Sequence, residues 1–315
     1  MITTFFRTSK PHHYFIFLFV LFSMHVFQRL GLLGQEFQCH NYVVEIIDLF
    51  ALFGILFLVV FIITKNNLTQ NNSLAAAYFC LFTVLIPEVI STHEILVSNL
   101  FVLMAYRRIF SMRTGLNLKK KCLDATLWLC VSALFYPLAI LFFAPLFLAI
   151  IQFQSDKLKH VLVVIFGIIS MALLAFLSHQ IFETTLPWDG FSKQSIGFDF
   201  TSFKDLFLLT SLGLFAILSA WAIFALFNER ISKSKFRFTF ITLIFMCVIA
   251  ITVVLISNPK SPTQLLFMLF PLSVLFANIS EISQLRWISD IIMIILVLLT
   301  AMRLTFNILD LHFLY

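Results

Sequence analysis

Charged residues are scarce in this sequence. Asp, Glu, Lys and Arg make up 11 % of its 315 residues, hydrophobic residues make up 61 %, Phe occurs 41 times, and the mean hydropathy is +1.03. A soluble protein carries about 25 % charged residues, so this composition excludes a water-facing surface over most of the chain. No stretch between apolar runs exceeds about 25 residues, which is too short for a separate soluble domain. We therefore predict a single transmembrane domain over residues 1–315.

Signatures of soluble enzymes and of metal centres are also missing. The five cysteines form no C-x-x-C pair and show no metal-ligand spacing. Gly-rich phosphate loops, G-x-S-x-G and H-E-x-x-H are absent as well. The sequence thus predicts no disulfide framework and no metal site, and it leaves any cofactor unknown. The cysteines are Cys39, Cys80, Cys122, Cys130 and Cys247.

Apolar runs of helical length occupy most of the chain. Each is close to the roughly 20 residues that a helix needs to cross a bilayer. We predict an all-α, polytopic transmembrane helix bundle with about ten membrane segments. No small-residue cleavage site follows the first run, so it is interpreted as a retained span. The runs cover approximately residues 14–33, 43–64, 74–91, 95–110, 123–152, 161–182, 206–228, 238–256, 264–282 and 287–309.

The run at residues 123–152 is too long for a single upright crossing. At about 1.5 Å per residue it exceeds a hydrocarbon core of about 30 Å, and Tyr136-Pro137 interrupts its middle. Proline removes a backbone donor and disfavours helix at the preceding residue. Two interpretations are open: one tilted, kinked span, or a V of two short helices. The V is favoured because it places most of the 21 Lys and Arg residues on one side of the membrane.

The V arrangement predicts a topology. The N-terminus is then inside, in the cytoplasm, and the outside face receives four loops. The net charge of +6 reflects basic residues beside the inside helix ends, where anionic lipid is the expected partner and nucleic acid is not. The predicted outside loops are Gly34–Asn41, Thr92–Glu94, Phe182–Asp205 and Ser257–Thr263.

Acidic residues near the outside face are the first candidates for catalysis. Glu94 follows His93 in a short turn, which suggests an acid/base pair, since His titrates near neutral pH. The alternative is a polar turn that caps the next helix. Glu36 lies in the first outside loop, and Glu45 and Asp48, three residues apart, share one helix face. These three could form a carboxylate site or simply carry interfacial charge.

Candidates for substrate binding lie in two other outside loops. Trp188 and Asp189 occupy a turn in the longest loop, where Trp188 could stack on a sugar or anchor the chain at the lipid headgroups. Lys260 is one cation on a cation-poor face and could bind a lipid phosphate or remain a solvated loop lysine. Arg303, inside the last run, should snorkel, face the bundle or pair with Glu or Asp.

Two segments resemble the membrane glycosyltransferases of the GT-C superfamily. Lys119–Lys121 followed by the double apolar segment around Tyr136-Pro137 is similar to their basic loop and bent helix pair. Lys260 ahead of a span that carries Pro271 is similar to their carboxyl-terminal loop. Those enzymes take sugars from polyprenyl-phosphate carriers on the outer side of the membrane, and the adjacent acidic pair familiar near their first span is missing here.

The resemblance implies roles for three residues. Glu36 or Glu94 would deprotonate an acceptor hydroxyl, and Lys260 would hold the carrier phosphate. The implied partners are membrane lipid and a polyprenyl-phosphate-linked sugar.

The whole chain more specifically resembles an uncharacterised family of bacterial multi-pass inner-membrane proteins, in which the stretch from Glu94 to Ser111 is typical. This implies a place in the bacterial cytoplasmic membrane and no particular activity. Three functions are compatible with the sequence: a GT-C-like glycosyltransferase, a transporter or flippase of a lipidic substrate, and a non-catalytic component of a cell-envelope assembly. The transporter hypothesis predicts a midplane cavity lined by Glu88, Asp290 or Arg303.

Overall fold

The computed structural model describes residues 2–30, 42–70, 72–153, 157–182, 206–226, 234–282 and 286–313. Throughout these ranges the regular structure is helical, which confirms the predicted all-α class. The predictions for Glu36, Trp188 and Asp189 lie outside the described residues.

The helices follow the apolar runs closely. The long helix α3, for example, covers the predicted run at 43–64 with one extra residue at its start and two at its end. In chain order the elements are α1 (Ile2–Phe6), α2 (Pro11–Arg29), α3 (Tyr42–Asn66), α4 (Leu74–Leu85), η1 (Pro87–Ile90), α5 (His93–Ser111), η2 (Met112–Thr114), α6 (Leu118–Phe135), η3 (Pro137–Phe142), α7 (Phe143–Phe153), α8 (Lys157–Phe182), α10 (Leu206–Leu226), α11 (Ser234–Ile256), η6 (Pro262–Leu265), α12 (Leu266–Ser280) and α13 (Arg286–Phe313).

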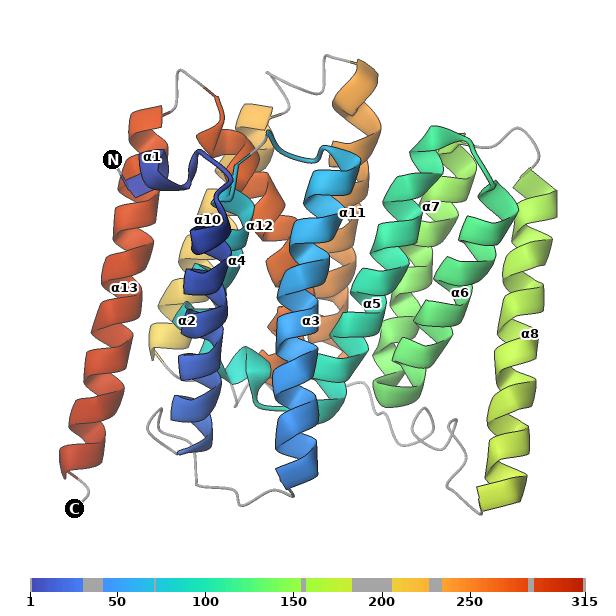
Figure 1. The fold of residues 1–315 in the computed structure, drawn as a ribbon, viewed down its shortest axis with the longest axis horizontal. Helices are drawn as coiled ribbons and strands as arrows, with labels where there is room; N and C mark the ends of the chain where they lie inside the picture. The colour runs from blue at the N-terminus through green and yellow to red at the C-terminus, as the bar shows by residue number, and fades with distance from the viewer. Residues whose placement is uncertain are drawn as a thin grey trace.

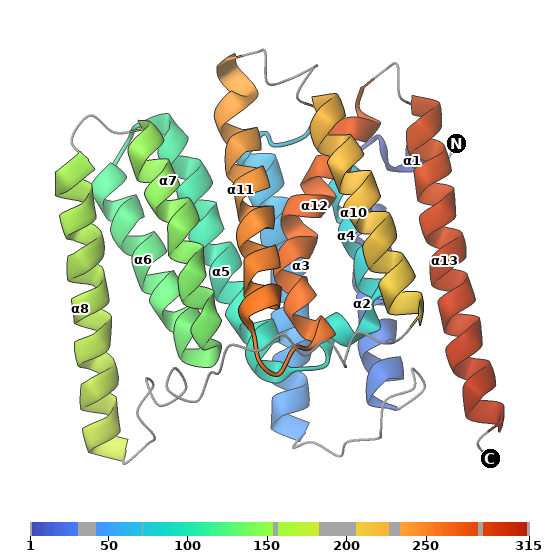
Figure 2. The same cartoon turned by 180° about the vertical axis from the view of Figure 1, so that it is seen from behind.

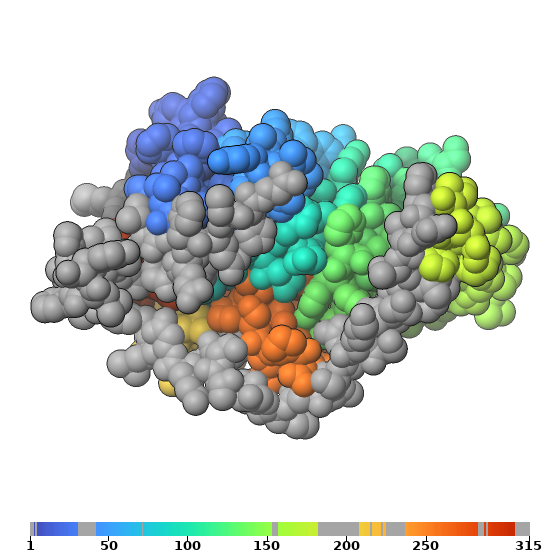
Figure 3. All heavy atoms as spheres, turned by 90° about the horizontal axis from the view of Figure 1, so that it is seen from below, coloured from blue at the N-terminus to red at the C-terminus, as the bar shows by residue number. Residues whose placement is uncertain are grey.

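Successive helices run up and down side by side (Figure 1 and, from behind, Figure 2). The lower end of the bundle, as drawn in Figure 1, is where α2, α4, α6 and α11 finish and where α3, α5, α7 and α12 begin. Figure 3 views this lower end, with α2 and α3 in blue and the turn between α11 and α12 in orange. The described helix ends that flank the four loops predicted to face outside also lie at the lower end, among them the end of α8 and the start of α10.

Proline creates two breaks at the lower end. Tyr136 is extended (φ −137°, ψ 106°), so the run at 123–152 divides into α6 and the segment η3–α7, which turns back toward the upper end (Figure 1). This is the V favoured by the sequence. Ile86 is also non-helical (φ −125°, ψ 76°), and Pro87 ends α4 after 12 residues. The run at 74–91, predicted as one span, is therefore a short helix followed by η1.

Length and composition distinguish spanning helices from shorter ones. Within the described residues, five helical stretches are long and apolar enough to cross a bilayer: 42–66, 93–114, 157–181, 237–256 and 262–280. The structure thus confirms a bundle with several apolar spans, but it does not confirm the predicted number of about ten membrane segments. The stretch at 262–280 is central, because all of its apolar window is buried, whereas only 17 % of the window of 157–181 is buried.

Candidate functional site

A buried carboxylate organises the lower end of the bundle. Asp48 lies on α3 two turns from its start, and its side chain is 0 % exposed. Arg29, in the last turn of α2, donates from Nη2 to Asp48 Oδ2 at 2.8 Å. A buried carboxylate is costly unless it is paired, so this contact explains how Asp48 is tolerated in an apolar bundle.

Glu45 extends the same cluster. Its Oε2 lies 2.7 Å from Arg29 Nε and 3.5 Å from His25 Nε2. Glu45 and Asp48 therefore share one face of α3 and one arginine partner, as their spacing predicts. The side chains of Arg29 and Glu45 are 19 % and 20 % exposed, so the cluster lies close to the surface without being fully solvated.

His93 completes the cluster from a third helix. It is the first residue of α5, and its Nδ1 contacts Asp48 Oδ1. Because an ionised carboxylate only accepts hydrogen bonds, Nδ1 is the donor and the lone pair of the neutral ring is on Nε2. The His93 side chain is 27 % exposed, in contrast to the buried Asp48. The arrangement is thus a partly exposed imidazole oriented by a buried carboxylate.

The charges of the cluster are unbalanced. It combines two carboxylates with one guanidinium, so with neutral imidazoles its formal charge is −1. A proton on an imidazole would neutralise that charge. Chemically, the group can accept a proton from a polar molecule at the surface and keep the resulting imidazolium beside Asp48.

A second ion pair lies at the break between α4 and α5. Arg303 of α13 is 3 % exposed; its Nη2 contacts Glu88 Oε1, and its Nη1 donates to the Leu85 carbonyl at 2.6 Å. Of the three alternatives that the sequence left open for Arg303, pairing with an acidic residue is the one observed. Asp290 does not join this pair: it accepts hydrogen bonds from Thr3 N at 3.1 Å and Thr3 Oγ1 at 2.5 Å. The three residues proposed to line a midplane cavity are therefore not gathered at one place.

Lys260 is buried in the turn between α11 and η6. It is 3 % exposed, and its Nζ donates to the carbonyls of Leu255 at 2.5 Å and Ser257 at 3.2 Å. These are carbonyls at the end of α11, where a cation is favourable. The η6 segment that follows packs against η1, so Lys260 and the ion pairs share the lower end. Binding of a carrier phosphate by Lys260 stays a prediction.

The other predicted residues are placed as follows. His93 is part of the cluster, but its partner is Asp48 and not the neighbouring Glu94, which is exposed. Sequence reasoning gave no role to Arg29 or His25. A signal existed for Arg29, because a cation ending an apolar run beside an outside loop is unusual under the positive-inside rule. Among the described residues, no group of His, Cys, Asp and Glu side chains is arranged to hold a metal ion.

Comparison with known proteins identifies the family. The chain matches the model of the family of unknown function DUF6427 over residues 6–311, and it belongs to that family. No curated protein and no solved structure matches the chain. The expectation of an uncharacterised family is thereby confirmed.

Proposed function

We propose that this protein is a membrane enzyme that transfers a sugar from a polyprenyl-phosphate carrier to an acceptor hydroxyl at the lower end of the bundle. The observation that carries the proposal is the contact between His93 and the buried Asp48. A general base needs a lone pair that a substrate can reach and a group that holds the ring in place. His93 and Asp48 supply these two requirements from different helices.

The proposed reaction follows from those roles. His93 Nε2 takes the proton of the acceptor hydroxyl as its oxygen attacks the anomeric carbon. The bond between that carbon and the phosphate oxygen breaks, and the carrier phosphate leaves with the electron pair. Attack opposite the leaving group inverts the anomeric configuration. Asp48 stabilises the imidazolium, and the hydrogen bond from Arg29 holds the Asp48 carboxylate in place.

The distribution of charge supports a site at the outer side. Basic residues gather at the upper end: Lys65, Lys119 and Lys120 are exposed, and Arg113 and Lys121 are partly exposed. The positive-inside rule favours a cytoplasmic upper end, and this supports an orientation with the N-terminus inside and the His93 site outside. Polyprenyl-linked sugars would then meet His93 from the outer leaflet of a bacterial cytoplasmic membrane.

The test uses the full chain reconstituted in liposomes with a panel of synthetic polyprenyl-phosphate hexoses. Release of polyprenyl phosphate and transfer of labelled sugar to a membrane glycan fraction are measured together. We expect His93→Gln to lower the rate by about 100- to 10,000-fold, the usual contribution of a general base. Asp48→Asn should also lower the rate, because an amide at residue 48 can donate to Nδ1 and so favour the His93 tautomer that has no lone pair on Nε2.

Glu94→Gln is the matched control, since Glu94 is adjacent in sequence and exposed. It should leave the rate unchanged if His93 is the base. Full activity of a folded His93→Gln protein would refute the proposed role. If Glu94→Gln alone abolished transfer, the base would be Glu94.

Transport of a lipidic substrate is a second candidate, favoured by the buried contact between Arg303 and Glu88 beside a broken helix. Interrupted helices with buried charges are typical of transporter sites. This function predicts that Glu88→Gln stops movement of a labelled polyprenyl phosphate between leaflets and that His93→Gln does not. The glycosyltransferase proposal predicts that His93→Gln lowers sugar transfer more than Glu88→Gln does.

A further inference from the structure

A hollow between α6 and α8 combines two cations with an apolar wall. Its volume is about 340 Å³, and it lies near the upper ends of both helices. Lys119 and Lys120 stand at its α6 side. Its remaining lining residues are Leu123, Leu162, Val163 and Phe166.

The two lysines are available for a ligand. Neither forms an ion pair with another residue in the described part of the chain. Their neighbour Lys121 is engaged elsewhere, since its Nζ donates to the Ser111 carbonyl at 2.6 Å and to Thr114 Oγ1 at 2.7 Å. The nearest acidic residue on α6, Asp124, is paired with Arg108 at 2.8 Å.

The electrostatic field around the hollow favours an anion. Lys119 and Lys120 lie in the first turn of α6, which contains no acidic residue. Lys157 begins α8 at the same end, again with no acidic residue in the first turn. Cations in the first turn oppose the positive end of the helix dipole, so a negative group nearby would stabilise both helices.

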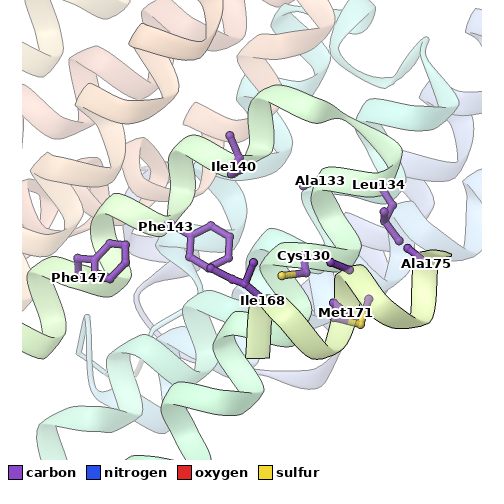
Figure 4. A pocket seen from close by; sticks show the side chains of 10 residues that line it. Cys130, Ala133, Leu134, Ile140, Phe143, Phe147, Ile168, Met171 and Ala175 are labelled. Atoms are coloured by element: carbon purple, nitrogen blue, oxygen red, sulfur yellow. The ribbon is translucent and has the colours of Figure 1, made fainter. Parts of the chain in front are cut away.

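The apolar wall continues into a surface that hydrocarbon must cover. Leu162 and Phe166 are 58 % and 74 % exposed, and the α8 helix is among the least buried spans. A second groove of about 350 Å³ opens between α6, α7 and α8, and Figure 4 shows its lining side chains, among them Cys130, Phe143 and Met171. That groove is wholly apolar in its lining and provides no charge that would select a ligand.

We propose that the hollow between α6 and α8 binds an anionic phospholipid of the bilayer. The headgroup phosphate lies between Lys119 and Lys120, and an acyl chain follows Leu123, Leu162 and Phe166 toward the bilayer centre. Charge selects the headgroup, because each lysine near the surface adds about 1 kcal/mol of attraction to an anionic lipid. This inference concerns the upper end and does not depend on the function proposed for the lower end.

The test measures retained lipid on the full chain by native mass spectrometry. The detergent contains equal amounts of phosphatidylglycerol and phosphatidylcholine with identical acyl chains. We expect the wild type to retain phosphatidylglycerol preferentially. Lys119→Gln with Lys120→Gln should reduce that preference by about 10- to 30-fold, the equivalent of two such contacts. Both lysines are exposed, so folding should be unaffected.

A matched control removes the same charge elsewhere. Lys10 and Lys65 are exposed lysines at the same end of the bundle, and Lys10→Gln with Lys65→Gln should leave the preference intact. Val163→Trp tests the hollow itself, since it fills the space and keeps every charge. It should lower retention of phosphatidylglycerol as the lysine variant does.

Three results would overturn the proposal. An equal loss of the phosphatidylglycerol preference in the Lys10→Gln, Lys65→Gln variant would show that the lysines act only through the general surface charge. Unchanged binding in a folded Val163→Trp protein would show that the hollow is not used. No preference in the wild type would show that no such site exists.

Discussion

Removing the Glu88 carboxylate should destabilise the protein strongly, because it takes a carboxylate counter-charge away from the buried Arg303 guanidinium. The Arg303 side chain is 3 % exposed and that of Glu88 is 21 % exposed. Loss of one partner from a buried ion pair costs about 3–5 kcal/mol. Because Glu88 keeps some access to solvent, we expect the lower value, about 3 kcal/mol, for Glu88→Ala. This equals a change of more than about 100-fold in the unfolding equilibrium constant.

The assay is reversible unfolding of the purified chain in mixed detergent micelles, followed by circular dichroism. The control is Asp124→Ala, which removes the partner of Arg108. That pair has the same ionic chemistry at 2.8 Å, but its side chains are 35 % and 37 % exposed. Exposed pairs contribute about 0–1 kcal/mol, so the control should change the free energy of unfolding by less than about 1 kcal/mol.

A double substitution distinguishes the loss of the ion pair from the cost of leaving one buried charge uncompensated. Glu88→Ala with Arg303→Leu removes both charges and should recover most of the lost stability, leaving about 1 kcal/mol for the Leu85 carbonyl that Arg303 no longer contacts. The reasoning would be refuted if Glu88→Ala cost no more than the exposed control. It would also be refuted if the double variant were less stable than the single one by a further 3 kcal/mol or so.

Other predictions follow from packing and exposure. Gly167→Ala should lower the free energy of unfolding by about 1–3 kcal/mol, because the added Cβ would lie 2.7 Å from Thr126 Cγ2. Gly213→Ala should instead stabilise α10 by about 0.5–1 kcal/mol, because the space around Gly213 is open. Lys260→Met should lower the unfolding midpoint by the equivalent of about 1–3 kcal/mol, since two carbonyls lose a charged donor; an unchanged midpoint would argue against this capping role. In a variant whose only cysteine is Cys130, a lipid-soluble maleimide should label the half-buried thiol faster than a charged one, as read by mass shift.

Local chemistry made much of the fold predictable from the sequence. Tyr136-Pro137 divides an apolar run that is too long for one crossing, and the structure breaks there because proline disfavours helix at the preceding residue. Pro87 acts similarly, yet its effect on the 74–91 run was missed. Hydropathy shows that the 74–91 segment is apolar, but it does not show where the helix within it ends.

The candidate site was less predictable, because its partners are distant in sequence. The shared face of Glu45 and Asp48 follows from helical spacing and is confirmed by their common partner Arg29. The contact of His93 with Asp48 spans 45 residues, and that of Arg303 with Glu88 spans 215. Such pairs depend on which helices become neighbours, and the hydrophobic pattern of a membrane protein, apolar on nearly every face, leaves that choice open.

The two ends of the bundle use polar residues differently, which bears on where chemistry can occur. Near the upper end, Tyr78 and Ser280 share a hydroxyl contact at 2.8 Å, Asn278 donates to the Leu68 carbonyl at 3.0 Å, and the buried His13 contacts Ser73 at 2.9 Å. Such contacts fix one helix against another. At the lower end, Asp48 is buried while its partner His93 is partly open to the surface. The imidazole of His93 therefore gives the polar cluster at the lower end a partly open side, whereas the imidazole of His13 near the upper end is 1 % exposed.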